Sequence, residues 1–97
     1  DLEEIKEDVF LDIFEDVPSV KISKNEYELI SNVEIFLQLS GLFKSNSEIK
    51  RSLKENSIMI NKERVNDHFD FDSISLIKKK YILLQKGKKN YFLINIQ

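Results

Sequence analysis

The spacing of apolar residues changes once along this 97-residue chain, and the change favours a mixed fold. Before Asn56 most apolar residues recur three or four positions apart, which is typical of amphipathic helices. After Asn56 they alternate with polar residues, which is typical of strands. A chain of this length has room for one small domain with a modest core. The pattern therefore predicts an α+β domain, in which a short helical hairpin packs on a small mixed sheet.

The first seventeen residues predict an acidic amphipathic helix. Pro18 ends it, because proline has no N–H to donate and moves the preceding residue out of the helical region. Val20 and Ile22 then alternate as a short strand. The apolar positions of the predicted helix are Leu2, Ile5, Val9, Phe10, Ile13, Phe14 and Val17.

Three later helix starts are marked by a serine followed three residues on by a glutamate, the pattern of a capping box. One helix ends at Gly41, which suits the left-handed conformation at a helix end, and the next ends near Asn56. The connection between them is short, so the sequence predicts a tight helical hairpin. The serine and glutamate pairs are Ser23 with Glu26, Ser31 with Glu34, and Ser45 with Glu48.

The second half of the chain predicts two strand pairs. Ile58, Ile60 and Val65 flank a polar turn over residues 61–63. Two further strands, over residues 81–85 and 91–96, are joined by the sequence Lys86-Gly87-Lys88-Lys89-Asn90. This is the pattern of a β-hairpin whose turn is almost wholly cationic.

Charge is divided unevenly between the two parts of the chain. Residues 1–34 carry eleven acidic residues and three lysines, a net charge near −8, whereas residues 35–97 carry twelve basic and six acidic residues, a net charge near +6. The overall charge of −2 therefore conceals a basic domain. A surface of this kind favours a polyanionic partner, and nucleic acid is the leading candidate.

The basic residues cluster around the predicted helix that begins after Ser45. Lys50, Arg51 and Lys54 fall on one arc of this helix, beside its apolar side. The N-terminus of the helix offers free N–H groups to a phosphate. The run of lysines at 78–80 and the turn at 86–89 add further cations. On composition alone, an ordinary solvated basic surface is an equally good interpretation.

Several classes of function find no support in the sequence. There is no cysteine, and a lone His68 cannot form a zinc site. Asp67, Asp70 and Asp72 lack the glycine and closing glutamate of a calcium loop. There is no nucleophile turn, Gly-rich phosphate loop, or apolar run of about 20 residues that could span a bilayer. We therefore expect a cytoplasmic chain that has no catalytic residue, bound metal or membrane partner.

Four segments together resemble the C-terminal domain of bacterial tyrosyl-tRNA synthetase. Residues 42–53 (LFKSNSEIKRSL) and 58–65 (IMINKERV) are similar to its alpha-L RNA-binding motif, which other RNA-binding proteins share. Residues 14–18 (FEDVP) resemble its junction with the catalytic half, and residues 80–93 (KYILLQKGKKNYFL) resemble its tail. Asn56-Ser57 replaces the family's usual Gly-Gly, and Ile49-Lys50 its Ala-Arg.

The resemblance implies a domain that positions tRNA(Tyr) for aminoacylation by a catalytic domain elsewhere in the same chain. Residues 1–17 would be an acidic linker helix from that catalytic half, and residues 18–97 the tRNA-binding domain. The parent would be a homodimeric tyrosine–tRNA ligase using ATP and Mg, whereas this part would be a non-catalytic monomer without a cofactor. By position, the residues implied to contact RNA are Lys44, Ser45, Lys50, Arg51, Lys54, Lys86, Lys88, Lys89 and Asn90.

Two alternatives remain open. The alpha-L motif also fits an RNA-binding domain from a ribosome-associated or pseudouridine-forming protein. In a different class, the chain could be a protein-interaction module whose partner meets the apolar stripe of the first helix.

Overall fold

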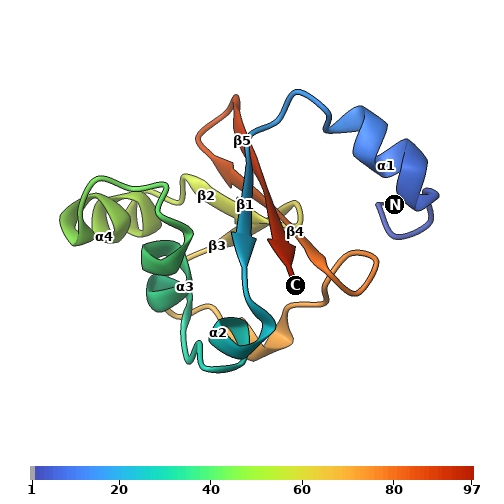
Figure 1. Cartoon of the computed structure of the whole chain (residues 1–97). Coiled ribbons are helices and arrows are strands. Elements are labelled where there is room, and N and C mark those ends of the chain that lie inside the picture. Colours follow the sequence, from blue (N-terminus) through green and yellow to red (C-terminus); the bar gives the residue numbers. More distant parts are fainter. Residues whose placement is uncertain (1) are drawn as a thin grey trace.

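The computed structural model describes residues 2–97 as a five-stranded sheet with helices on both faces (Figure 1). The helices and strands alternate irregularly along the chain, so the architecture is α+β, as the sequence predicts. In chain order the elements are α1 (Glu7–Ile13), β1 (Ser19–Ile22), α2 (Lys24–Glu28), α3 (Val33–Ser40), α4 (Asn46–Lys54), β2 (Ile58–Ile60), β3 (Glu63–Val65), the 3₁₀ helix η1 (Phe71–Ser73), β4 (Tyr81–Lys86) and β5 (Asn90–Ile96).

The sheet has the order β1-β5-β4-β2-β3 and is mixed. β1 runs parallel to β5, with Ser19 opposite Leu93, and the other neighbours are antiparallel. β4 occupies the centre of the sheet, and its residues from Tyr81 to Gln85 are all buried. Strands that are covered on both faces contain nearly continuous apolar runs, and the YILL sequence that begins β4 is such a run.

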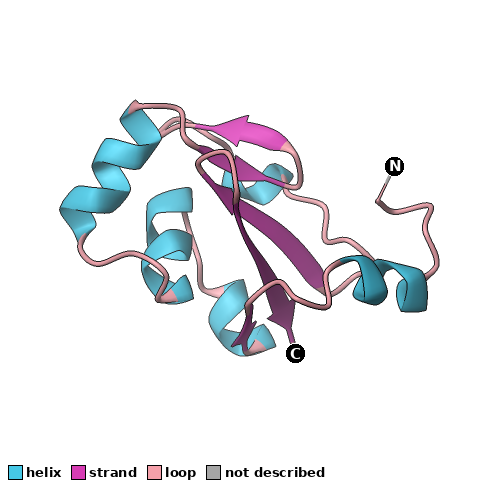
Figure 2. Ribbon diagram, turned by 90° about the horizontal axis from the view of Figure 1, so that it is seen from above, coloured by secondary structure: helices cyan, strands magenta, loops and turns pink. Residues whose placement is uncertain are grey.

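Each face of the sheet supports its own apolar cluster, because successive side chains of a strand point to opposite faces. Ile82, Leu84 and Ile94 face the layer formed by α2, α3, α4 and η1, where the larger cluster lies. Leu83 and Leu93 belong to the smaller cluster around Phe10 of α1. Figure 2 shows α1 on the other side of the sheet from α2, α3 and α4.

The first helix is shorter than predicted. It covers Glu7–Ile13, whereas the segment on to Val17 forms turns that lead into β1. A seven-residue helix can present only one narrow side to the sheet, and Phe10 occupies that side with no exposed surface. Helical spacing predicts Val9 and Ile13 on the apolar face, but they are 44% and 55% exposed. The chain bends after this helix, so that Phe14 and Val17 still pack against the Phe10 cluster.

Two of the three predicted capping boxes mark real helix starts. Ser23 and Ser45 accept hydrogen bonds from the backbone N–H three residues on, at 3.1 and 3.2 Å. The prediction for Ser31 is wrong: α3 is capped by Asn32, whose side chain accepts from the Ile35 N–H at 2.9 Å. Asparagine caps helices as well as serine does, so Asn32 can take the capping position in place of Ser31.

Left-handed residues follow α3 and α4 and close the β2–β3 turn. Gly41 ends α3 with φ 71°, as predicted, and Asn56 follows α4 with φ 56°. The turn between β2 and β3 has two residues, Asn61 and Lys62, both with positive φ. The Asn61 side chain accepts from the Leu83 N–H and donates to the Ser75 carbonyl, which ties the turn to the centre of the sheet.

Replacing Phe10 with alanine tests whether α1 contributes to the stability of the domain. A fully buried phenylalanine typically costs about 3–5 kcal/mol when it is truncated to alanine, because apolar packing is reduced and a cavity remains. The free energy of unfolding, measured by urea denaturation, should fall by an amount of this order. The matched control Val9→Ala lies on the same helix but is largely exposed, so it should change stability within about ±0.5 kcal/mol. Equal unfolding midpoints for the two variants would contradict the packing of Phe10 against the sheet.

Candidate nucleic-acid interface

The helix α4 presents a basic side to solvent. Ile49 and Leu53 are buried against the core, whereas Lys50, Arg51 and Lys54 are exposed, as their spacing predicts. None of these three cations has a carboxylate within 4 Å in the part of the chain that the structure describes. Lys50 and Lys54 also line a shallow cavity with Glu34 and Asp67, so acidic residues border this surface on one side.

Lys86, at the end of β4, joins the sheet to the helical hairpin. Its Nζ lies 2.5 Å from a carboxylate oxygen of Glu48, in the first turn of α4. The same Nζ lies 4.7 Å from the ring centroid of Phe43, in the turn between α3 and α4. Lys86 is predicted to contact RNA, but its charge is already paired within the protein. This contact joins α4 to the end of the β4–β5 hairpin, and an RNA contact by Lys86 stays a prediction.

The environment of Glu48 favours its ionised form. The hydrogen bond from Lys86 lowers the pKa of the Glu48 carboxyl below its ordinary value of 4.5, and the Lys44 backbone N–H and charge act in the same direction. Burial acts against this shift but does not reverse it. Glu48 therefore remains charged at neutral pH and keeps its partner.

The turn between β4 and β5 lies directly beside the end of α4. The N–H of Gly87, which has φ 74°, donates to the carbonyl of Ser57 at 2.7 Å. The Gln85 side chain donates to the Gly87 carbonyl at 3.0 Å and so helps to shape the turn. Lys88, Lys89 and Asn90 remain exposed at its tip.

These contacts bring most of the predicted residues to one end of the domain. Lys44 and Ser45 precede α4, and Lys88 and Lys89 lie on the turn that contacts the loop after α4 (Figure 1). Ser45 is exposed, although its hydroxyl oxygen already accepts the capping bond of α4. We call the surface formed by Lys44, Ser45, Lys50, Arg51, Lys54, Lys88, Lys89 and Asn90 the basic face.

Lys78 and Lys80 contact the acidic first segment of the chain and do not join the basic face. The Lys78 N–H donates to the Glu3 carboxylate, and the Lys78 Nζ donates to the Glu3 carbonyl at 2.6 Å. The Lys80 Nζ lies 2.7 Å from Glu7 of α1. This lysine and the Tyr81 hydroxyl, in that order, lower the pKa of the Glu7 carboxyl. The acidic segment thus binds these cations on the side of the sheet that α1 covers.

Two exposed cations near the basic face are absent from the sequence prediction. Lys62 lies in the β2–β3 turn, with its Nζ 5.0 Å from the ring centroid of Tyr91. Arg64 of β3 donates from Nη1 to the carbonyl of Asn56, at the end of α4. The alternation of residues 58–65 could have revealed Arg64. It places the Arg64 side chain on the face of the sheet away from the apolar side chains of Ile58 and Val65.

Metal and membrane sites find no support among residues 2–97. No group of three or more His, Cys, Asp or Glu side chains there could hold a metal ion. The His68 side chain is 90% exposed and has a carboxylate oxygen of Asp67 3.6 Å away. No helix in this range combines the length and apolar character needed to cross a membrane.

Comparison with known proteins agrees with this architecture. Residues 10–94 match the family profile "Tyrosine--tRNA ligase SYY-like C-terminal domain". The chain is 43% identical over its full length to a tyrosine–tRNA ligase of Flavobacterium psychrophilum, of which it covers 23%. It is 39% identical over 99% of its length to the ligase of Flavobacterium johnsoniae, and 34% identical over 96% to that of Bacteroides thetaiotaomicron, covering 22% of each.

The α+β fold with its basic face and these matches together define a domain of the aminoacyl-tRNA synthetase class. The chain belongs to the family of tyrosine–tRNA ligase C-terminal domains. It spans less than a quarter of the length of the curated relatives it matches, and the match falls in their C-terminal part.

Acid titration tests the junction between Lys86 and Glu48. A carboxyl whose pKa is lowered by folding adds stability that is complete above its unfolded value, near 4.5, and is lost as the pH falls through the folded value. The Lys86→Met variant should therefore be less stable than the unaltered domain at neutral pH. The difference in stability between the two should shrink as the pH falls below the ordinary pKa of Glu48. The measurement is the urea midpoint across the range from about pH 3 to 7.

Lys88→Met is the matched control for this titration. It removes the same charge from the exposed tip of the turn, where no carboxylate pairs with it among the described residues. A pH-dependent difference as large for Lys88→Met as for Lys86→Met would mean that net charge, rather than the Glu48 contact, is responsible.

Proposed function

We propose that this domain binds tRNA(Tyr) through the basic face and positions it for a catalytic domain elsewhere in the same polypeptide. One observation above all supports this. The Lys86–Glu48 pair and the Gly87–Ser57 hydrogen bond bring two separate cationic segments to one end of the fold. Cations that lie on one surface can neutralise neighbouring phosphates of one RNA backbone.

In this proposal, aminoacylation is carried out by the rest of the full-length parent protein. The parent is a cytoplasmic tyrosine–tRNA ligase, a homodimer that uses ATP and Mg, and this domain contributes affinity and orientation. Its relatives carry that name and are more than four times as long, which supports the assignment. The family match makes a ribosome-associated or pseudouridine-forming parent the weaker candidate.

Exposed apolar side chains on α1 support a contact with the catalytic part of the same chain. Val9, Leu11 and Ile13 are 44%, 39% and 55% exposed on this short helix. Covering such side chains stabilises a contact by removing apolar surface from water. Hydrogen exchange compares the two situations directly: the amides of α1 should be better protected in the full-length parent than in this domain alone. Equal protection in the two would contradict the contact.

Paired charge removals test the basic face. Lys50→Ala/Arg51→Ala and Lys88→Ala/Lys89→Ala should each weaken binding of a tRNA(Tyr) transcript. The slope of log affinity against log salt should fall by about 0.7–0.9 for each phosphate that is no longer neutralised. Lys6→Ala/Lys24→Ala removes the same charge from the acidic part of the chain and should leave the slope unchanged.

Binding is measured at two or more salt concentrations, with circular dichroism as the check on folding. If all three pairs weaken binding equally, the RNA responds to net charge and no defined face exists. If the unaltered domain does not bind RNA even at low salt, the proposed function is wrong.

A further inference from the structure

One row of side chains crosses the sheet on the side opposite the helical hairpin, and Tyr91 at one end of it packs against the cluster that α1 covers. Strand register places Arg64 opposite Met59, Met59 opposite Gln85, and Gln85 opposite Tyr91. Cross-strand neighbours on one face lie about 4.5–5.5 Å apart, so the row is continuous. Gln85 is buried, but Tyr91 and Met59 are half-buried and Arg64 is exposed, which leaves both ends of the row accessible to solvent.

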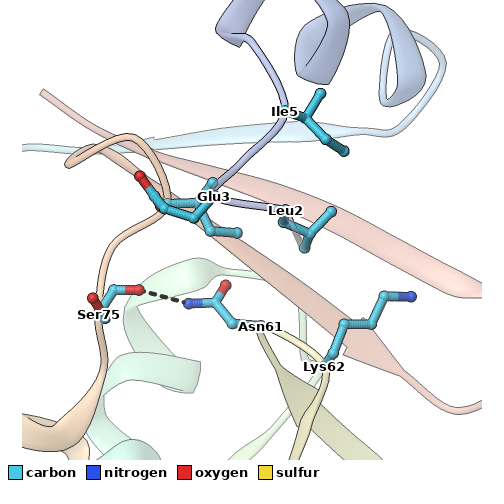
Figure 3. A pocket seen from close by; sticks show the side chains of 7 residues that line it. Leu2, Glu3, Ile5, Asn61, Lys62 and Ser75 are labelled. Atoms are coloured by element: carbon cyan, nitrogen blue, oxygen red, sulfur yellow. Dashed lines mark hydrogen bonds between the residues drawn. The ribbon is translucent and has the colours of Figure 1, made fainter.

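Tyr91 ends the row as an aromatic surface with a cation above it. The Lys62 Nζ lies 5.0 Å from the centroid of the Tyr91 ring, and Lys62 is exposed. Lys62 also borders an open groove of about 570 Å³ between the first residues and the β2–β3 turn. Figure 3 shows this groove, with Leu2 and Ile5 on one side and Asn61 and Lys62 on the other. A flexible lysine beside open space can move away from the ring without disturbing the core.

This row is continuous with the basic face at two points. Tyr91 directly follows Asn90 of the cationic turn. Arg64 donates to the carbonyl of Asn56 at 2.6 Å, which places its guanidinium at the end of α4. A guanidinium has five N–H donors, so this bond leaves others for a phosphate. RNA bound on the basic face therefore lies within reach of the row.

We propose that Tyr91, Lys62 and Arg64 form a second RNA contact, in which one unpaired base stacks on Tyr91, Lys62 holds the phosphate of that nucleotide, and Arg64 holds a neighbouring phosphate. This inference rests on the proposed function and extends it. Aromatic side chains on sheets bind unpaired bases by stacking, and a stacked base contributes more than an exposed cation–π contact does. When a base stacks on Tyr91, the Lys62 ammonium group can thus leave the ring and bind a phosphate.

The acidic residues near this row do not block it. Glu3 lines the groove, but its carboxylate accepts the backbone N–H of Lys78. Asp16 lines a shallow cavity together with Tyr91, and Lys89 lines the same cavity as a neighbouring cation. Glu63 lies between Lys62 and Arg64 in the sequence, but the alternation of side chains along β3 directs it to the other face of the sheet from Arg64. The two cations favour an anionic ligand, and the aromatic ring favours one that carries a base.

A tryptophan placed at position 91 reports stacking directly, because the chain has no other tryptophan. Fluorescence of Tyr91→Trp should be quenched by a tRNA(Tyr) transcript and far less by a fully paired RNA duplex. Leu29→Trp is the matched control, since Leu29 is 83% exposed beside α2, away from the cationic turn (Figure 1). It should show little quenching with either RNA.

Affinity separates stacking from charge. Tyr91→Leu keeps an apolar side chain but removes the ring, and it should weaken tRNA binding about ten-fold without changing the salt slope. Tyr91→Phe should bind tRNA as tightly as the unaltered domain does. Lys62→Ala should lower the salt slope by about 0.7–0.9, as expected when one phosphate is no longer neutralised. Thermal unfolding confirms that each variant is folded.

The outcomes distinguish this inference from the proposed function. If Lys50→Ala/Arg51→Ala weakens binding while Tyr91→Leu does not, or if duplex RNA quenches position 91 as strongly as the transcript does, the second contact is overturned and the basic face stands. If the unaltered chain binds no RNA at all, both fail together.

Discussion

The central strand β4 must be covered on both of its faces, and the other layers follow from this requirement. Ile82 and Leu84 point to one side of the sheet and Tyr81 and Leu83 to the other, and all four are buried. The helical hairpin covers only one side. Without α1, the apolar surface of Leu83 and Leu93 would face water, at a cost of about 25 cal/mol for each Å² exposed. The acidic first helix is therefore part of the packing of the sheet.

The two halves of the chain differ in charge partly because they bind one another. Glu3 and Glu7 contact the loop at Lys78 and Lys80, next to the apolar cluster beneath α1. At the other end of the domain, Glu48 pairs with Lys86. Such exposed or partly exposed ion pairs add little stability individually. They do determine which lysines already have a carboxylate partner within the domain. The exposed cations of the basic face remain available for a partner.

The placement of the hairpin turn links the fold to the proposed function. The turn joins the central strand β4 to its neighbour β5, and its Gly87 N–H is bonded to the loop after α4. Cations on a rigid sheet end and on a capped helix keep a fixed spacing, so the ordering cost on binding a phosphate backbone is reduced. Lys86 at the end of β4 pairs with Glu48, whereas Lys88 and Lys89 of the turn face solvent.

Local patterns in the sequence determine many of the elements of this protein. Some features depend only on neighbours within a few residues, so the sequence alone predicts them. They are the serine caps of α2 and α4, the left-handed end at Gly41 and the turn of the final hairpin. The cationic arc of α4 follows from helical spacing in the same way. Competition between adjacent residues is harder to foresee, which is why Asn32 rather than Ser31 begins α3.

Contacts between distant segments were decided only by the tertiary structure. Helical periodicity places Val9 and Ile13 on an apolar face, but the sheet accepts Phe10 alone from the short α1. The pairing of Lys86 with Glu48, 38 residues away, and the cross-strand row that ends at Tyr91 depend on strand order and register. Neither is encoded in local spacing, because pairing across a sheet is set by the combined packing of all its strands.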